Sequence, residues 1–452
     1  MQFNQQLKRE GDINTSSFRT KWLNQLSTAS LKKIQNDEQV FMKQSMSTPC
    51  LNGIIDADGC YLTDVNGKKY LDFHGNSSHQ VGYKNPFVVE AVKNQMDRLP
   101  FIPRRFTADI AIEAAEALVN KTVSKDYKVL FTPSGSAAVG LALKIARKVT
   151  GKHKVISMWE SFHGAGLDTI SVGGEYVFNK DMGPLLPGML KAIPYNGYRN
   201  LIGITNSEVY ADFCLDYLEY LIQHEADIGA ILLEPIRATD THIPPKSYFK
   251  RLRNICDKYG IVLIFDEIPT ALMRSGKFYV HQLFDIEPDI LVLGKGLGGG
   301  MIPQAAVLAK TKYDCAEDVS LGHYTHEKPA LGCAAICATI DYIDTFGLEE
   351  NCVAQSQFVK DQLNRLYDKF ECIGDTRIAG LLITIELVVD RQTKEKHDLL
   401  AEQLLYFCLE NGLSFKISGG NCLTWHPPLI VTKEQLAFAV GLLEEGLEKY
   451  TV

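Results

Sequence analysis

Two charged residues stand at the ends of apolar runs in the second half of the chain. Asp266 ends the run "IVLIFD", and Lys295 ends "DILVLGK" just before the glycine cluster "GLGGG". A buried carboxylate is costly unless it is paired, so Asp266 either caps a turn or meets a cation. Burial lowers the pKa of a lysine and makes the amine usable as a nucleophile and a base. For a lone lysine, however, an ordinary solvated charge is the favoured explanation.

Two further segments carry groups that suit a bound cofactor. "FTPSGSAAVGLALK" places Ser134, Gly135 and Ser136 between a predicted strand and a predicted helix, where free N–H groups suit a phosphate. Taken alone, this segment is better explained as a serine-capped turn with no ligand. "SMWESFHGAG" places Phe162 and His163 just after another predicted strand, where an aromatic ring could stack on a flat cofactor. Taken alone, Phe162 is better explained as a core aromatic.

The elements that must position these residues alternate along the chain. Short apolar strands separated by amphipathic helices predict an α/β fold with a mainly parallel sheet covered by helices on both faces. Ligands of such sheets bind at the carboxyl ends of the strands, which is where all four segments fall. The strands are expected at 127–132, 154–158, 228–236, 261–267 and 289–295, and helices at 136–151, 247–260 and 330–346.

The pattern also predicts a division into domains. Residues 75–330 form the large domain, and residues 331–452 form a smaller α+β domain with long helices. The N-terminal segment 1–74 is expected to contribute to the small domain. Within it, residues 1–45 predict one or two short helices, and residues 59–73 a β-hairpin that turns at "NG".

Composition excludes several classes of protein. The chain has 452 residues, 46% of them hydrophobic, and a net charge of -7, which argues against nucleic acid or an anionic membrane as a partner. The 11 cysteines show no CxxC spacing, so neither a metal site nor a disulfide framework is expected, and a reducing cytoplasm is the expected location. No apolar run is long enough for a transmembrane helix.

The combination of these segments indicates one cofactor. A phosphate cup, a stacking aromatic, an acid and a lysine, in that order and all at strand ends, describe a site for pyridoxal 5'-phosphate (PLP). Lys295 would form a Schiff base with the aldehyde, and Asp266 would keep the pyridine nitrogen protonated so that the ring accepts electrons.

The sequence resembles the class III (ω-type) aminotransferases, which are fold type I PLP enzymes, over about residues 45–448. The resemblance rests on "SGSAAVGLALKIAR", "SFHG", "LLEPI", "IFDEI…RSGKF", "PDILVLGKGLGGG", "YTHEKPALGCAA" and "HPPLIVTKEQL", in the order of the family. It implies a homodimer with shared active sites, in which Thr325 reaches the phosphate of the neighbouring subunit. It also implies that Glu234 and His163 lie near the ring or the substrate. The phosphate is assigned to Ser134, Gly135 and Ser136, and the ring face to Phe162.

Three departures from the family pattern bear on the reaction. Pro269 stands where a glutamine often touches the ring hydroxyl, and Ala165 and Thr424 stand where many members carry arginine. The arginine replaced by Thr424 grips the carboxylate of the keto acid that a transaminase needs. The paired arginines Arg104 and Arg105 are instead candidates for binding an anionic substrate, although a structural ion pair explains either one alone equally well. Arg237 is a third candidate.

These departures resemble a lyase subgroup of the family, which eliminates rather than transaminates. The expected activity is therefore a PLP-dependent ammonia-lyase acting on an aminophosphonate or amino alcohol. Three alternatives remain open: an ω-aminotransferase, a phospho-lyase acting on an amino-alcohol phosphate, and a non-catalytic PLP-fold protein that binds partners.

Overall fold

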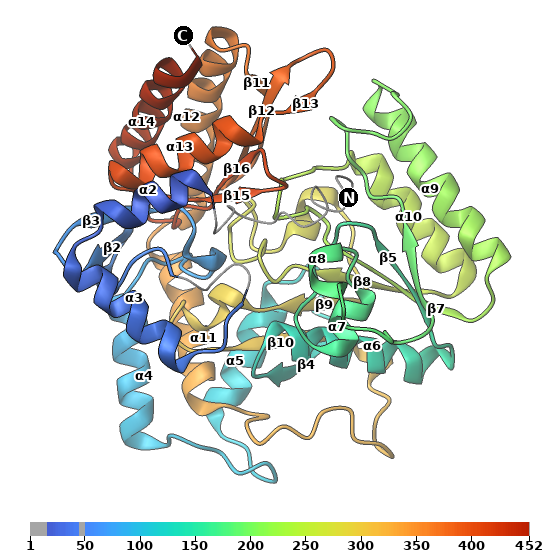
Figure 1. The fold of residues 1–452 in the computed structure, drawn as a ribbon. Coiled ribbons are helices and arrows are strands. Elements are labelled where there is room, and N and C mark those ends of the chain that lie inside the picture. Colours follow the sequence, from blue (N-terminus) through green and yellow to red (C-terminus); the bar gives the residue numbers. More distant parts are fainter. Residues whose placement is uncertain (1–15, 45–49, 452) are drawn as a thin grey trace. The chain divides into compact units, whose positions relative to one another are not determined.

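The computed structural model describes residues 16–44 and 50–451 (Figure 1). The chain forms two compact units. Unit 1 consists of residues 1–85, 239–241 and 350–452, and unit 2 of residues 86–238 and 242–349. The division predicted from the sequence, with borders at residues 74 and 330, stays a prediction.

Unit 2 is built on a seven-stranded sheet in the order β4-β10-β9-β8-β7-β5-β6. The pairs β6–β5, β5–β7, β7–β8 and β8–β9 are parallel, and β10 runs antiparallel to both β4 and β9. The mainly parallel sheet agrees with the sequence pattern, which did not predict β6 or β10. The strands are β4 (Tyr127–Thr132), β5 (Lys154–Met158), β6 (Met189–Ala192), β7 (Ile228–Leu233), β8 (Val262–Asp266), β9 (Ile290–Leu293) and β10 (Ala305–Lys310).

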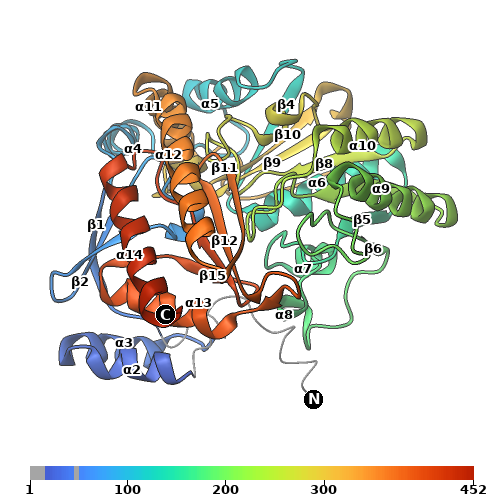
Figure 2. The ribbon, with the colours of Figure 1, turned by 90° about the horizontal axis from the view of Figure 1, so that it is seen from above.

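Helices cover both faces of this sheet (Figure 2). Val262 and Ile264 of β8 belong to the apolar cluster that α6 closes on one face. Phe265 points to the other face, where its ring centroid lies 5.7 Å from that of Phe249 of α10. The helices are α4 (Pro86–Arg98), α5 (Asp109–Asn120), α6 (Gly135–Thr150), α7 (Leu167–Val172), α8 (Tyr176–Asn179), α9 (Ser207–His224), α10 (Lys246–Tyr259) and α11 (Ala330–Thr345), with short 3-10 helices η2 (Val280–Phe284), η3 (Lys295–Gly298) and η4 (Thr311–Tyr313).

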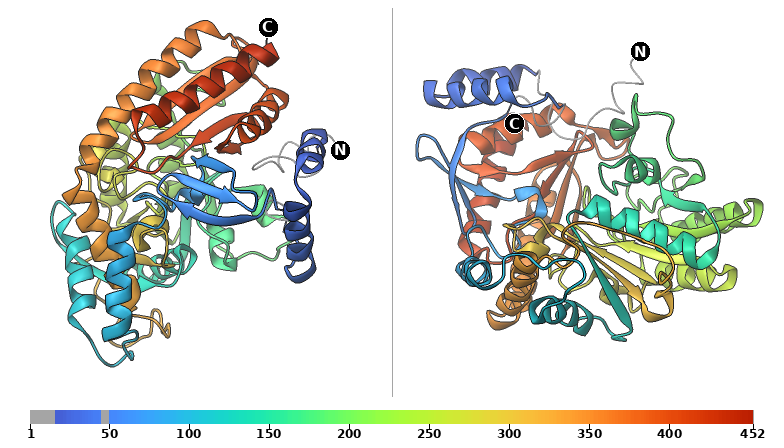
Figure 3. Two further views of the ribbon diagram at one scale, coloured as in Figure 1. Left: turned by 90° about the vertical axis from the view of Figure 1, so that its left-hand side faces the viewer. Right: turned by 90° about the horizontal axis from the view of Figure 1, so that it is seen from below.

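Unit 1 has two small sheets, β1-β2-β3-β14 and β11-β12-β16-β15, and β13 pairs with β12. The helices α12 and α14 lie side by side (Figure 3), joined by the Arg365–Glu444 ion pair at 2.6 Å. The elements are α2 (Ser17–Gln25), α3 (Thr28–Val40), β1 (Ile54–Asp58), β2 (Tyr61–Asp64), β3 (Lys69–Asp72), η1 (Gly75–Ser77), most of α12 (Leu348–Lys369), β11 (Ile373–Ala379), β12 (Leu382–Asp390), β13 (Glu395–Lys396), α13 (Asp398–Glu410), β14 (Leu413–Ser414), β15 (Lys416–Ser418), β16 (Cys422–Trp425) and α14 (Lys433–Thr451).

The local expectations hold with small shifts. The helices α2 and α3 and the β2–β3 hairpin form where the sequence predicts them, and residues 1–15 lie outside the described residues. One expectation is wrong in detail: β9 ends at Leu293, so Lys295 is the first residue of η3 rather than the last of a strand.

Two further observations concern helix length and metal ligands. Within residues 16–44 and 50–451, no single helix is long and apolar enough to cross a membrane, and α11 with α12 meets the length and composition criteria only as a bent pair. The same residues contain no group of three or more His, Cys, Asp or Glu side chains placed to hold a metal ion.

Candidate active site

Four predicted site segments follow neighbouring parallel strands of the unit 2 sheet. Phe162 and His163 come after β5, Glu234 directly follows β7, Asp266 ends β8, and Lys295 follows β9. Because β5, β7, β8 and β9 are adjacent and parallel, their carboxyl ends meet at one edge of the sheet. The fold therefore gathers residues that are far apart in the chain at the place where open α/β sheets bind their ligands.

Asp266 is buried and paired. Its Oδ2 accepts a hydrogen bond from Nδ1 of His163 at 2.9 Å, and its Oδ1 accepts one from the backbone N–H of Ile268 at 3.1 Å. His163 is itself only 1% exposed, and its Nε2 is without a hydrogen-bond partner among the described residues. The carboxylate is thus held in a fixed orientation while the second ring nitrogen of His163 keeps an unused hydrogen-bonding position.

Glu234 links the segment after β5 to the segment after β7. Its Oε1 accepts from the backbone N–H of Phe162 and its Oε2 from that of Ala238, both at 3.2 Å. Burial raises the pKa of Glu234, and the nearby Asp266 raises it further, whereas His163 and Arg237 lower it. Glu234 therefore holds the backbone after β5 close to the backbone after β7, and its charge state depends on the charged groups around it.

Lys295 has a backbone conformation that is uncommon for a residue with a side chain, at φ +49°. Solvent reaches part of the Lys295 side chain, but many protein atoms surround its amine. The resulting desolvation lowers the pKa of that amine. The buried guanidinium of Arg274 lowers this pKa too, while Glu234 and Asp266 raise it. A lysine in this setting reaches its neutral, nucleophilic form at a lower pH than an ordinary surface lysine.

The N-terminus of α6 lies beside the loop that follows β5. Ser134 is the N-cap and accepts from the N–H of Ala137 at 3.2 Å, and the hydroxyl of Ser136 accepts from the N–H of Ala165 at 3.0 Å. The N–H groups of Gly135 and Ser136 are without a partner in the described part of the chain, as expected for the first turn of a helix. This end of α6 can bind an anion such as phosphate.

Glycines let two of these backbones approach closely. A Cβ on Gly135 would lie 2.6 Å from Cδ1 of Ile268, the residue whose backbone N–H donates to Asp266. A Cβ on Gly164 would lie 2.4 Å from Oγ and 2.9 Å from Cα of Ser136, and Gly164 also has φ +129°. The loop after β5 therefore packs directly on the N-terminus of α6.

Phe162 stands at the edge of this arrangement. Its side chain is 39% exposed, and its ring centroid lies 4.6 Å from that of Phe178 with the planes tilted by 47°. The contact leaves part of the ring uncovered, so Phe162 is not the fully buried core aromatic that its sequence context alone favours. An uncovered ring at this edge is suited to stacking on a flat cofactor.

The remaining predicted residues lie apart from this cluster or are already paired. Nη1 of Arg237 lies 2.6 Å from Oε2 of Glu160. Arg104 and Arg105 are exposed in the turn before α5, and Nε of Arg104 lies 4.0 Å from Oε2 of Glu327. Thr325 is exposed in the segment before α11. Within the described residues, no hydrogen bond or ion pair joins Thr325, Arg104 or Arg105 to Lys295 or Asp266.

Sequence reasoning missed two residues that the structure brings to the site. Glu160 pairs with Arg237, and Arg274 is fully buried and acts on the charge of Lys295. Glu160 stands just before "SFHG", and nothing in the sequence around it indicates that its partner lies 77 residues further along the chain. Arg274 opens the motif "RSGKF" shortly after Asp266, the acid that ends a buried strand. The short distance in the chain between this arginine and that acid was the signal that could have identified Arg274.

Of the three departures, Thr424 has the clearest structural setting. Its hydroxyl donates to the carbonyl of Thr239 at 3.0 Å and lies 3.2 Å from Oγ of Ser418, all within unit 1. Thr424 is 2% exposed, so its short side chain is buried and its hydroxyl is bound by neighbouring residues. A buried threonine that is already hydrogen-bonded cannot replace a carboxylate-binding arginine.

The groups gathered in unit 2 fit PLP chemically. Lys295 supplies an amine of lowered pKa, Asp266 a fixed buried carboxylate, α6 an anion-binding N-terminus, and Phe162 a partly uncovered ring. These match, in order, the aldehyde, the pyridine nitrogen, the phosphate and the ring face of the cofactor. The individual roles of these residues stay predictions.

Comparison with known proteins agrees with the site. Residues 42–447 match the family model described as aminotransferase class-III. The chain is 46% identical to the (R)-1-hydroxy-2-aminoethylphosphonate ammonia-lyase of Vibrio splendidus strain 12B01, over 98% of this chain and 95% of that protein. It is 30% identical to the alanine/serine racemase of Pyrococcus horikoshii, over 86% of this chain and 84% of the racemase.

A solved structure shares the fold. The amine transaminase of an uncultivated Pseudomonas species, in its PLP-bound form, superposes with a TM-score of 0.83 at 28% identity, over 88% of this chain and 94% of the transaminase. The predicted fold class, that of the fold type I PLP enzymes, is thereby confirmed. The family model spans nearly the whole chain, so the protein belongs to the class III aminotransferase family.

Proposed function

We propose that this protein is a PLP-dependent ammonia-lyase that converts (R)-1-hydroxy-2-aminoethylphosphonate into phosphonoacetaldehyde and ammonia, a step of phosphonate breakdown. The observation that carries the proposal is the 46% identity, along nearly the entire chain, to the relative with this activity in its name. The buried, hydrogen-bonded Thr424 supports it, because the usual anchor for a keto acid is missing. Eleven free cysteines fit a cytoplasmic location.

The residues of unit 2 have distinct tasks in this reaction. PLP, when bound, acts as an electron sink for the carbon next to the amine. Lys295 would hold the cofactor and, once released, remove the proton from that carbon. Asp266, oriented by His163, would keep a proton on the ring nitrogen. The N-terminus of α6 would bind the phosphate, and Phe162 would lie against the ring.

Elimination then balances without a second substrate. The C–H bond breaks at the carbon that bears nitrogen, its electron pair forms a carbon–carbon double bond, and the C–O bond of the hydroxyl breaks. The hydroxyl would leave as water with a proton donated by Lys295. The released enamine takes up one water and splits into the aldehyde and ammonia. The phosphonate stays attached and serves as the anchor for a cationic side chain.

The deciding experiment omits the keto acid. Purified holoenzyme is mixed with the aminophosphonate, and ammonia is measured over many enzyme equivalents. A lyase releases ammonia continuously. An aminotransferase releases none: it transfers the amino group once to its cofactor, and it continues only when pyruvate is added, with alanine as the product. Ammonia that never exceeds one equivalent for any aminophosphonate or amino alcohol would overturn the proposal. Release of inorganic phosphate would instead identify a phospho-lyase.

An aminotransferase is the second candidate. A solved structure that shares the fold is an amine transaminase, and identity to it is 28%. At 30% identity the family also includes a racemase, so membership alone leaves the reaction open. Lys295 and Asp266 weigh against a non-catalytic role. Borohydride trapping of PLP on the protein tests this, since a chain with no label on Lys295 would not be a PLP enzyme.

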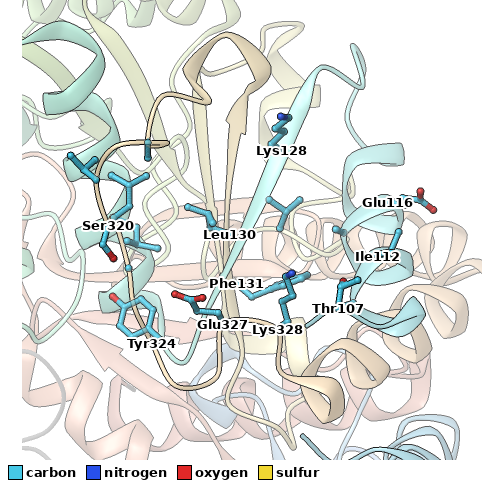
Figure 4. A pocket seen from close by; sticks show the side chains of 18 residues that line it. Thr107, Ile112, Glu116, Lys128, Leu130, Phe131, Ser320, Tyr324, Glu327 and Lys328 are labelled. Carbon is cyan, nitrogen blue, oxygen red and sulfur yellow. The ribbon is translucent and has the colours of Figure 1, made fainter. Parts of the chain in front are cut away.

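The homodimer is part of the same proposal. A cavity of about 870 Å³ opens in unit 2 between α5, β4 and the segment before α11 (Figure 4). Ile112, Leu130 and Val319 line it and are 46%, 41% and 44% exposed. Exposed apolar side chains grouped in this way mark an interaction surface, and Tyr324, the neighbour of Thr325, lines the same cavity. We place a second copy of this chain on this surface.

Light scattering tests the dimer. Leu130→Lys should give a monomer that retains PLP poorly, because a charge would be buried in the interface. Val209→Lys, at a 51% exposed position on α9, is the matched control and should stay dimeric. A dimeric Leu130→Lys variant with full PLP content would place the interface elsewhere.

Arg104 and Arg105 are proposed to act in the partner's site. Their turn packs against the segment that carries Thr325: the ring centroids of Phe101 and His326 lie 5.1 Å apart, and Arg104 faces Glu327. Mixing Lys295→Ala subunits with Arg105→Ala subunits should then restore activity, since each mixed dimer contains one intact site. Mixed dimers as inactive as the parent variants would assign the arginines to their own subunit.

A further inference from the structure

Arg237 differs from Arg104 and Arg105 in its surroundings. It follows Glu234 closely in the chain, and its charge lowers the pKa of that carboxyl group. The backbone N–H of Phe162 donates to Glu234, which ties the segment of Arg237 to the segment that follows β5. Arg237 is thus the candidate anion binder that belongs to the same residue cluster as Lys295.

The partner of Arg237 comes from that second segment. Oε2 of Glu160 lies 2.6 Å from Nη1 of Arg237, so an ion pair joins the two segments beside the Phe162–Glu234 hydrogen bond. The side chain of Arg237 is 16% exposed and that of Glu160 is 61% exposed. A carboxylate that stays largely hydrated makes a weak pair, which another anion can replace at small cost.

The backbone holds Glu160 in place rather than leaving it in a mobile turn. Glu160 has φ +61°, a conformation that is uncommon for a residue with a side chain. The N–H of Trp159 donates to the carbonyl of Ala192 at 3.0 Å, and the N–H of Gly174 donates to the carbonyl of Ser161 at 2.8 Å. A Cβ on Gly174 would lie 2.6 Å from the backbone N of Glu160.

We propose that Glu160 is a placeholder for the anionic end of the substrate. Its carboxylate holds the guanidinium of Arg237 in the free site and is displaced when a phosphonate binds there. The inference rests on the proposed function, because it assumes that Arg237 receives the phosphonate. The step makes and breaks no covalent bond.

A placeholder has a consequence for turnover. An attached carboxylate has a high effective concentration, so every anion that reaches Arg237 binds more weakly than it would to a free guanidinium. The substrate has a second anchor in its amine and tolerates this competition. The aldehyde product keeps the phosphonate but has lost the amine, so the competition speeds its release.

The test is binding to the holoenzyme by calorimetry. The probes are hydroxymethylphosphonate, which carries the anion without an amine, and ethanolamine, which carries the amine without the anion. Glu160→Gln should tighten binding of hydroxymethylphosphonate about fivefold, the size expected for loss of one exposed competing ion pair, and leave ethanolamine unchanged. With the aminophosphonate, both KM and kcat should fall in this variant, because product leaves more slowly.

Two further variants identify the cause. Glu225→Gln removes an acid that pairs with Lys154 at the other end of β5, at 2.6 Å, and should leave both probes unchanged. In an Arg237→Gln background, Glu160→Gln should no longer tighten hydroxymethylphosphonate. Unchanged or weaker binding of hydroxymethylphosphonate to Glu160→Gln overturns the proposal, since Glu160 would then only support Arg237.

These outcomes are independent of the lyase assay, because neither probe needs to react. Tighter binding of hydroxymethylphosphonate to Glu160→Gln in an enzyme that releases no ammonia would refute the proposed function and support the role of Glu160 as a placeholder. Continuous ammonia release with unchanged binding of hydroxymethylphosphonate would support the proposed function and refute the placeholder.

Discussion

Gly164→Ala should weaken PLP binding through the backbone alone. The new Cβ would lie 2.9 Å from Cα of Ser136, a contact that no rotamer change relieves, at a residue with φ +129°. Such a backbone costs about 1–3 kcal/mol for a residue with a side chain, and an overpacked contact costs about as much. The least costly relief is a shift of the first turn of α6, whose N–H groups are predicted to hold the phosphate.

The expected loss follows from these terms. If about 3 kcal/mol of strain is relieved only when the phosphate contacts are given up, the Kd for PLP rises about 100-fold. The assay titrates PLP into apoenzyme and follows absorbance, with circular dichroism to show that the fold is retained.

A control at the other end of the same helix separates strain from contact. Gly151 is the C-cap of α6 at φ +65°, and a Cβ there would have nothing within 4 Å. Gly151→Ala should lower stability by about 1 kcal/mol and leave PLP affinity unchanged. If Gly164→Ala binds PLP within threefold of the parent protein, the packing of this loop on α6 does not support the phosphate site.

The other predictions concern charge. Lys295→Ala should abolish turnover while leaving part of the PLP affinity, measured by ammonia release and by equilibrium dialysis; residual catalytic turnover would refute the role of Lys295. The pKa of Lys295 is lowered from 10.5, so the neutral amine appears as pH rises through a value below 10.5, and borohydride trapping of PLP on Lys295 should show its midpoint there; a midpoint at or above 10.5 would contradict the burial argument. Glu267→Ala should lower the Tm strongly, because the buried carboxylate accepts from the N–H of Val280 at 2.6 Å and from N and Nδ1 of His281 at 2.9 and 3.0 Å, and losing such a group costs about 3–5 kcal/mol. Arg105→Ala should raise KM for the aminophosphonate far more than for ethanolamine; equal effects on both would remove it from the anion site.

Much of the architecture was predictable because its signals are local. The strands β4 and β5 begin and end where the apolar runs do, and α6 and α10 end one residue before Gly151 and Gly260. β10 was missed because its run, "AAVLAK", is rich in alanine, a residue depleted in strands, and its antiparallel pairing with β4 and β9 leaves no local signal. Direction within a sheet depends on the partner strands rather than on the residues of the strand itself.

Composition, strand ends and motif order therefore determined, from the sequence alone, the fold class, the cofactor and the residues expected to meet it. Only the tertiary structure decided the partners of those residues: His163 on Asp266, Glu160 on Arg237, and Arg274 near Lys295. The physical reason is range. Periodicity and caps act over a few residues, whereas a buried charge is paired with whatever group the packed sheet brings within about 3 Å, however far apart the two lie in the chain.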